Sequence, residues 1–208
     1  MLDKLAIYGA GGHGKVVADI AELLGWKTIH FFDERYLDTK KNGPWPVVGN
    51  FAQLCKKANN YDGVVVAIGN NLVRLEKQRL LRDAGASMVS IIHPLAVVSS
   101  YASVGPGTVI CAGAVINAFT TVGEAVIINT QASVDHDCVL ANGVHICPGT
   151  HIAGNVTIGE ASWVGIGCSI IQQLSITDHV YIGAGSVVVK DIEESGTYFG
   201  VPAKLIKS

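Results

Sequence analysis

The sequence predicts two domains, an α/β domain over residues 1–93 and a parallel β-helix of hexapeptide repeats over residues 94–208. Two observations predict the β-helix: an aliphatic residue stands at every sixth position, and a small residue stands two places before most of them. A third observation, a glycine-rich turn between a strand and a helix, predicts the α/β domain.

The aliphatic repeat runs without interruption from Val98 to Val188. A period of six fits neither a helix nor a simple strand and is typical of a hexapeptide β-helix. Each hexad then forms a short strand and a corner, and three hexads form one coil of a triangular prism. Neighbouring coils bury the inner face that one coil cannot bury alone. The repeated positions are Val98, Val104, Ile110, Ile116, Val122, Ile128, Val134, Leu140, Ile146, Ile152, Ile158, Val164, Ile170, Ile176, Ile182 and Val188.

The residues that flank each aliphatic position predict the corners of the prism. Small residues such as Thr108, Cys138 and Ser162 stand two places before it, and we expect them to fit a narrow corner. Glycine often follows it, where we expect the corner to need a positive φ angle. These glycines are Gly105, Gly123, Gly159, Gly165 and Gly183.

Composition excludes several classes of protein. Charged residues make up 15% of the chain and the net charge is −2, so no basic stripe for nucleic acid is present. No apolar run reaches the length of a membrane span, and the first residues lack the pattern of a signal peptide. Five cysteines without a CxxC pair indicate free thiols in a reducing compartment, so we expect a cytoplasmic protein.

The first domain reads as alternating strands and helices. Strands are expected at Leu5–Tyr8 and Lys27–Phe32, with a helix at Val16–Leu24 between them. Further elements are a loop at Asp38–Val47, helices at Phe51–Lys57 and Leu72–Ala84, and strands at Gly63–Ile68 and Met88–Ile91. The loop is expected either to close over a ligand or to cover the sheet.

The turn after the first strand matches G-x-G-x-x-G through Gly9, Gly11 and Gly14. Such a turn presents backbone N–H groups and a helix N-terminus to phosphate, and Asp33 ends the next strand where an acid can bind ribose or base. Gly69-Asn70 ends another strand at the same carboxyl edge. NAD binding is one reading and a structural turn without ligand is another. The domain is about half a dinucleotide fold, which favours a mononucleotide.

A polar cluster interrupts the plain walls of the repeat and comprises Asn129, Asp135-His136-Asp137, His145 and His151. Histidine and aspartate can ligate zinc, but these residues lie on different walls, which argues against a metal site. A histidine near its ordinary pKa can instead act as a general base, oriented by an adjacent carboxylate. The third reading is a solvated surface without a role.

The repeat, the closing Gly200-Val201-Pro202-Ala203-Lys204 and the Gly9–Gly14 turn together resemble the sialic acid O-acetyltransferase family of left-handed β-helix acyltransferases. Within that family the chain is most similar to the UDP-4-amino-sugar N-acetyltransferases of bacillosamine synthesis. The resemblance covers essentially the whole chain. It implies a half-Rossmann-like nucleotide-sugar-binding domain, a left-handed β-helix that binds acetyl-CoA, and a homotrimer with acetyl-CoA between neighbouring prisms.

The resemblance also implies roles for individual residues. The catalytic pair of the family falls on His136 and Asp137, where relatives often carry Glu in place of Asp137, and an Asn falls on Asn129. Acetyl-CoA would contact His145, Gly154, Ile166, Gly183 and Ala184, with the Gly154 N–H at the thioester carbonyl. The nucleotide-sugar site would comprise Gly9, Gly11, Gly12, His13, Gly14, Asp33, Glu34, Gly69 and Asn70.

The implied activity is transfer of acetyl from acetyl-CoA to the amine of a UDP-4-amino-4,6-dideoxy-N-acetyl-sugar, by direct attack with His136 as base. The alternatives are O-acetylation of sialic acid, N-acetylation of GDP-perosamine, a non-catalytic hexapeptide scaffold and an NAD-dependent oxidoreductase. The partners expected are the nucleotide-sugar and acetyl-CoA, without nucleic acid, membrane or metal. The sequence alone does not define the sugar, the base or the pathway.

Overall fold

A computed structural model describes residues 3–206, and the chain divides into two compact units, residues 1–94 and residues 95–208. Within the described residues, no helix combines the length and the apolar character needed to cross a bilayer.

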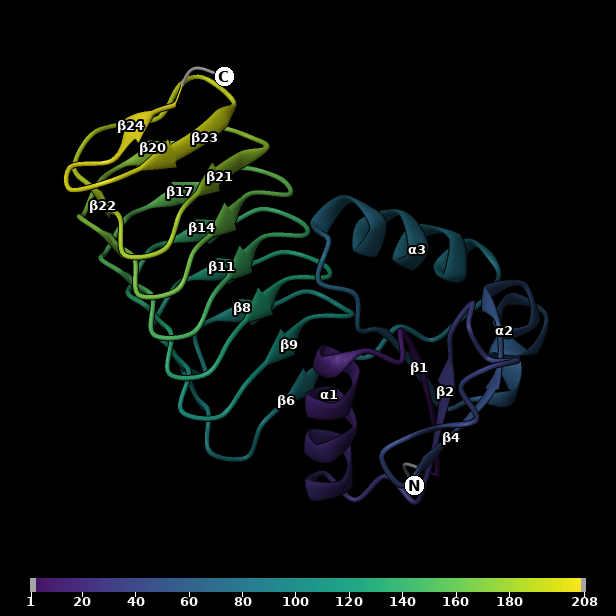
Figure 1. The fold of residues 1–208 in the computed structure, drawn as a ribbon. Coiled ribbons are helices and arrows are strands. Elements are labelled where there is room, and N and C mark those ends of the chain that lie inside the picture. The colour runs from purple at the N-terminus through teal and green to yellow at the C-terminus, as the bar shows by residue number, and fades with distance from the viewer. Residues whose placement is uncertain (1–2, 207–208) are drawn as a thin grey trace. The chain divides into compact units, whose positions relative to one another are not determined.

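The first unit is a five-stranded sheet with helices (Figure 1), and its strand order is β3-β4-β2-β1-β5. β1 pairs in parallel with both β2 and β5. Every residue of β5 and four of the five in β1 are buried, as expected for central parallel strands covered on both faces. The elements are β1 (Lys4–Tyr8), α1 (Gly12–Leu23), β2 (Thr28–Phe32), β3 (Lys41–Asn42), β4 (Trp45–Gly49), α2 (Phe51–Lys57), η1 (Ala58–Asn60), β5 (Gly63–Val66), α3 (Asn71–Asp83) and β6 (Ile91–Ile92).

Three expectations for this unit are corrected. The predicted loop Asp38–Val47 contains β3 and the start of β4, which form a hairpin and extend the sheet beside β2. The predicted helix at Val16–Leu24 begins four residues earlier, at Gly12, because Gly11 in extended conformation is its N-cap. Over Met88–Ile91 the chain makes only a single bridge, from Met88 to Val64, before β6.

The second unit is the predicted β-helix, and its coils stack in register (Figure 1). Paired strands lie eighteen residues apart, as in Ile110↔Ile128↔Ile146. From Ile110 onward every aliphatic position of the repeat is buried, each contributing roughly 1.5–3 kcal/mol by its removal from water. Val98 and Val104 are only half-buried, because β7 and β8 are the first strands of their sheets.

Three sheets form the walls of the prism and are called here the first, second and third wall. The first wall comprises β9 (Val109–Ile110), β12 (Ile127–Ile128), β15 (His145–Ile146), β18 (Trp163–Val164), β21 (Val180–Ile182), β23 (Gly196–Phe199) and β24 (Lys204–Leu205). The second comprises β7 (Val97–Val98), β10 (Val115–Ile116), β13 (Ser133–Val134), β16 (His151–Ile152), β19 (Ser169–Ile170) and β22 (Val187–Val188). The third comprises β8 (Ser103–Val104), β11 (Thr121–Val122), β14 (Val139–Leu140), β17 (Thr157–Ile158) and β20 (Ser175–Ile176).

The glycines that follow the aliphatic positions have a different role from the one expected. None of the five has a positive φ angle. A Cβ on Gly165 would lie 2.6 Å from the Ile182 carbonyl oxygen, and one on Gly105 would lie 2.6 Å from the Gly123 carbonyl carbon. Glycine is therefore required by the close approach of successive coils. Positive φ occurs instead at the last corner residue, as in Gly167 and Asp137.

The small corner residues join neighbouring coils by hydrogen bonds. The Thr120 hydroxyl donates to the Asp135 carbonyl at 2.6 Å, and Thr150 donates to Gly165 at 2.7 Å. The thiols of Cys138 and Cys168 occupy equivalent positions and donate to the carbonyls of Ala153 and Gly183. Because buried polar groups need partners, these short side chains satisfy carbonyls inside the prism.

Candidate active site

The corners of the prism carry the chemistry-bearing residues of the second unit. The first corner joins the first and second walls, through residues 111–113, 129–131, 147–149, 165–167 and 183–185. The second corner joins the second and third walls, through residues 99–101, 117–119, 135–137, 153–155 and 171–173. The third corner includes residues 159–161 and 177–179.

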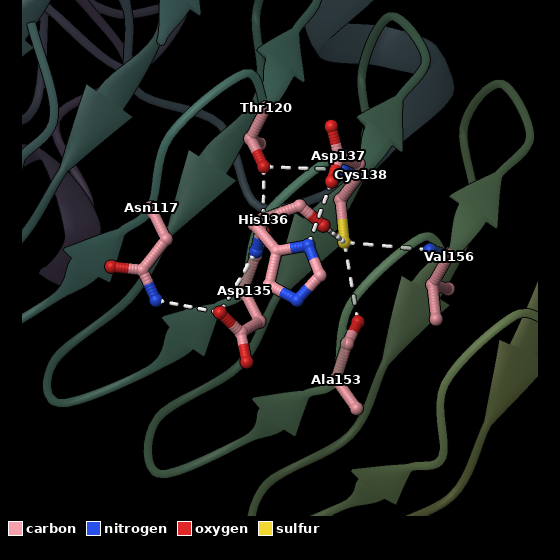
Figure 2. Close-up of polar contacts among 8 residues, drawn as sticks. All are labelled: Asn117, Thr120, Asp135, His136, Asp137, Cys138, Ala153 and Val156. Atoms are coloured by element: carbon pink, nitrogen blue, oxygen red, sulfur yellow. Dashed lines mark hydrogen bonds and ion pairs between the residues drawn. The ribbon is translucent and has the colours of Figure 1, made fainter. Parts of the chain in front are cut away.

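His136 and Asp137 form an exposed ion pair on the second corner (Figure 2), with Nδ1 and Oδ2 2.7 Å apart. Asp137 has φ 58°, a left-handed conformation that aspartate tolerates better than most residues. The hydrogen bond that His136 donates to Asp137 raises the pKa of His136 above its ordinary value. With Nδ1–H directed at the carboxylate, the lone pair of the neutral ring is on Nε2.

A second carboxylate fixes the backbone of the same corner (Figure 2). Asp135 Oδ1 accepts from the Asn117 amide at 2.8 Å and from the His136 N–H at 2.9 Å. These hydrogen bonds, from Asn117 first, lower the pKa of Asp135. Sequence reasoning missed Asn117, although its position eighteen residues before Asp135 places it one coil away.

Gly154 lies against the imidazole from the next coil. A Cβ there would lie 2.6 Å from His136 Cε1 and 2.7 Å from Nε2, so a side chain at this position would displace the ring from its place. Among residues 3–206 the Gly154 N–H donates no hydrogen bond to another backbone group. The corner therefore presents a basic nitrogen beside an available backbone donor, an arrangement suited to proton transfer and to oxyanion stabilisation.

Asn129 and His145 lie apart from this group, on the first corner and the first wall. Asn129 Nδ2 is 3.2 Å from His145 Nε2, and Asn129 Oδ1 accepts from the Thr130 N–H at 2.8 Å. Ile166 is 60% exposed on the same first corner, and Gly183 and Ala184 lie one coil beyond it. The sequence-predicted residues of this unit thus fall into two sets, one on the second corner and the other on the first corner and the first wall.

A pocket of about 310 Å³ lies in the first unit at the carboxyl ends of β1, β2 and β5. Of the nine residues predicted for the nucleotide-sugar site, seven line it: Gly9, Gly11, Gly12, His13, Asp33, Glu34 and Gly69. Gly11 and Gly12 leave open space where a side chain would stand. The N–H groups at the start of α1 meet the pocket here, which suits an anion.

The other two predicted residues serve the scaffold. Gly14 packs against the Gly9 carbonyl and the Phe31 ring, so that α1 approaches the sheet closely. Asn70 is the N-cap of α3, where its side chain accepts from the Val73 N–H at 3.0 Å. Neither residue lines the pocket.

Internal hydrogen bonds already engage the two pocket carboxylates. Asp33 accepts from the Ala10 N–H at 2.9 Å and from Arg35 Nε at 3.0 Å. Burial alone would raise the pKa of Asp33, but the hydrogen bonds from Arg35 and the backbone outweigh it and lower the pKa. Glu34 accepts from the Tyr8 hydroxyl at 3.1 Å. Tyr8 and Arg35 were missed by sequence reasoning, although both stand at strand ends beside predicted residues.

Arg74, also missed, is fully buried and holds the backbone of two residues that line the pocket. Its guanidinium donates to the carbonyls of Ile68 and Gly69 at 2.8 and 3.1 Å and to Asn71 Oδ1 at 2.9 Å. Burial lowers the pKa of Arg74 to about 9, and burial followed by the charge of Arg74 lowers the pKa of His13 to about 4. No sequence signal distinguishes Arg74 from the other arginines of α3.

Within residues 3–206, no three or more His, Cys, Asp or Glu side chains are grouped to hold a metal ion. A β-helix with a histidine–carboxylate pair at a corner is the arrangement expected of a hexapeptide-repeat acyltransferase.

Comparison with known proteins narrows this class. Residues 4–81 match the family model described as the PglD N-terminal domain. A curated relative, UDP-N-acetylbacillosamine N-acetyltransferase of Bacillus subtilis, is 35% identical over 122 residues. That alignment covers 53% of this chain and 52% of the relative, so it spans about half the length of each.

Solved structures match over nearly the full length. The acetyltransferase domain of PglB from Neisseria gonorrhoeae, in complex with acetyl coenzyme A, is 42% identical with a TM-score of 0.94, and 98% of each chain is covered. PerB from Caulobacter crescentus, in complex with CoA and GDP-perosamine, is 38% identical with a TM-score of 0.93, covering 98% of this chain and 97% of that one. The chain therefore belongs to the family of nucleotide-amino-sugar N-acetyltransferases that these proteins represent.

Proposed function

We propose that this protein transfers the acetyl group of acetyl-CoA to the amine of a UDP-4-amino-4,6-dideoxy-N-acetyl-sugar, giving a product of the UDP-diacetylbacillosamine type. The observation that carries the proposal is the His136–Asp137 pair beside the Gly154 N–H. The complexes formed by its relatives, with acetyl coenzyme A or with CoA and GDP-perosamine, support both substrate classes.

His136 is the proposed general base. The amine nitrogen attacks the thioester carbon, and Nε2 of His136 takes the proton that the nitrogen loses. The Asp137 carboxylate stabilises the imidazolium, as its short hydrogen bond to Nδ1 already favours the protonated ring. When the carbon–sulfur bond breaks, the same proton is available to the CoA thiolate. No covalent enzyme intermediate is formed.

The Gly154 N–H is the proposed donor to the thioester oxygen as it becomes negative. Backbone donors of this kind contribute to catalysis because they are already oriented toward the developing charge. A general base contributes about 10²–10⁴-fold. The larger share of the rate enhancement then comes from holding amine and thioester together.

A second copy of the chain is proposed to complete the site. His136, Asp137 and Gly154 lie on the second corner, whereas Asn129, His145, Ile166, Gly183 and Ala184 belong to the first corner and first wall. The whole second wall separates these corners within one prism. Packing the second corner of one chain against the first corner of another brings the two sets together. A homotrimer satisfies this arrangement three times by closed symmetry.

The pocket of the first unit is the proposed nucleotide site. Gly11, Gly12 and His13 at the start of α1 would hold the phosphates, with Asp33 and Glu34 at the base or ribose. Free thiols at all five cysteines fit a reducing compartment, so we place the reaction in the cytoplasm.

The test is release of CoA thiol from acetyl-CoA with a panel of acceptors: UDP-4-amino-4,6-dideoxy-N-acetylglucosamine, GDP-perosamine and free sialic acid. Rapid release with the UDP-sugar alone is expected. Turnover of GDP-perosamine or sialic acid instead would retain the chemistry and change the acceptor. Light scattering in the same buffer should give about three chain masses, and a monomer would contradict the shared site.

A further inference from the structure

Two exposed aromatic side chains lie on the second corner, on the coils that precede His136. Tyr101 is 70% exposed and Phe119 is 63% exposed. Their ring centroids are 5.5 Å apart, with an angle of 36° between the planes. Large aromatic side chains normally contribute by burial, so an exposed pair in contact calls for a ligand or partner.

The turn that carries Phe119 lies next to the turn that carries His136 and Asp137. Phe119 and Asp137 are eighteen residues apart, and each is the third residue of its turn. The Asp137 N–H donates to the Ala118 carbonyl at 3.1 Å, so the two turns are stacked coil on coil. The spacing of hydrogen-bonded strands is about 4.8 Å, which places the Phe119 backbone one such step from that of Asp137.

The backbone of Phe119 is in a conformation that a phenylalanine rarely adopts. Its φ angle is 62°, and the equivalent residues in later coils are Asp137, Asn155 and Gln173. Aspartate and asparagine are enriched in this left-handed region, whereas a bulky residue there is an outlier. Within one chain the ring is exposed, so burial inside the prism does not offset the strain. An outlier of this kind beside a reactive group points to function.

We propose that Phe119 and Tyr101 form an acceptor platform, an apolar subsite for the deoxygenated edge of the sugar whose amine meets His136. This inference rests on the proposed function and adds the residues that select the sugar. A 4-amino-4,6-dideoxy-sugar carries a methyl group at C5 and C–H bonds on its ring face, which suit an aromatic surface. A sugar with a 6-hydroxyl would lose water there without gaining a hydrogen bond.

The first test compares two acceptors that differ only in this hydroxyl, UDP-4-amino-4,6-dideoxy-N-acetylglucosamine and UDP-4-amino-4-deoxy-N-acetylglucosamine. Wild type should prefer the 6-deoxy sugar by about 10- to 100-fold in kcat/KM, the range that one hydroxyl in an apolar site produces. Phe119→Asn should remove most of this preference by raising KM for the 6-deoxy sugar. KM for acetyl-CoA should not change. Phe119→Tyr should retain the preference.

The second test measures the unfolding temperature of Phe119→Asn. If Phe119 only stabilised the fold, its replacement would lower this temperature. Asparagine suits the left-handed backbone, so Phe119→Asn should unfold at the same temperature as wild type or higher. His179→Asn is the matched control, because His179 has φ 58° and is exposed on the third corner. It should leave both acceptor KM values unchanged.

The outcomes separate a failure of the acceptor platform from a failure of the proposed function. If wild type acetylates neither amino-sugar, the proposed function fails and the platform fails with it. If wild type is active but Phe119→Asn keeps both the KM and the preference, the platform alone is wrong. A lower unfolding temperature, or a changed oligomer mass by light scattering, would show that Phe119 packs within the fold or against a second copy, and would overturn the inference.

Discussion

The two units make their candidate sites in different ways. In the first unit the pocket is formed by backbone: three strand ends and the start of α1 meet, and Gly11 and Gly12 leave the space open. In the second unit every coil repeats the same backbone, and only side chains distinguish the corner of His136 from its neighbours. In a repeat scaffold the position of a site thus depends on which side chains a coil carries, whereas in an α/β unit it depends on where the strands end.

The largest expected effect is on catalysis in the second unit. His136→Ala should lower kcat by about 10²–10⁴-fold, because the general base is lost, while KM for the sugar changes little. His151→Ala is the matched control, since this exposed histidine contacts Ser133 on the second wall and belongs to neither corner. Steady-state kinetics decides, and a fully active His136→Ala protein would rule out the mechanism.

Stability of the first unit should depend on one buried charge. Arg74→Met removes the donor for the Ile68 and Gly69 carbonyls and should lower the free energy of unfolding by roughly 2–5 kcal/mol. Arg79→Met on the exposed face of α3 should change it by less than about 0.5 kcal/mol. Denaturant unfolding measures both, and equal effects would contradict the special role of Arg74.

Close packing of the coils predicts a cost in the second unit. Gly165→Ala should lower the free energy of unfolding by roughly 1–3 kcal/mol, because its Cβ would lie 2.6 Å from the Ile182 carbonyl oxygen, a backbone atom. Thermal or denaturant unfolding tests this. An unchanged variant would mean that the coils can separate without penalty.

The pH dependence of the rate should report the His136–Asp137 pair. Because the hydrogen bond to Asp137 raises the pKa of His136, the neutral base forms only at higher pH, and kcat should rise with pH through that raised pKa. Asp137→Asn removes the carboxylate, so the rise should shift to lower pH while the plateau falls. A pH–rate profile that is the same in both proteins would assign the titration to another group.

The smallest expected change in stability is at the glycine turn of the first unit. Gly11→Ala should lower the free energy of unfolding by no more than about 1 kcal/mol, because a Cβ meets nothing within 4 Å and φ is −95°, so that the only cost is that of a poorer N-cap. The methyl group would nevertheless enter the pocket and raise KM for the nucleotide-sugar. Unchanged KM would indicate that the phosphates bind elsewhere. With Gly165→Ala, this variant separates glycines needed for packing from glycines needed for a ligand.

Sequence reasoning was strongest where the chain repeats itself. The aliphatic residue at every sixth position from Val98 to Val188 defines the prism, because each coil must bury one aliphatic residue per wall. It was weaker for single events. The hairpin within Asp38–Val47 pairs with β2 through a tertiary contact. Asn70 was assigned to the nucleotide-sugar site, although an Asn directly before a predicted helix is also a common N-cap. The prediction that the corner glycines need a positive φ angle was wrong. They are needed because the next coil approaches closely, and the sequence of one hexad does not show that approach.

By itself the sequence determined the register of the β-helix, the strand–turn–helix that opens the chain and the adjacency of His136 and Asp137. These are local or periodic features, and they do not depend on how the rest of the chain is arranged in space. Only the tertiary structure decided that Gly154 lies against the His136 ring and that the buried Arg74 donates to carbonyls of the pocket lining. It also decided that Asn129 and His145 lie on the first corner and the first wall, away from His136. Those relations depend on which coil or strand lies next in space, and stacking and burial set them rather than neighbouring residues in the chain.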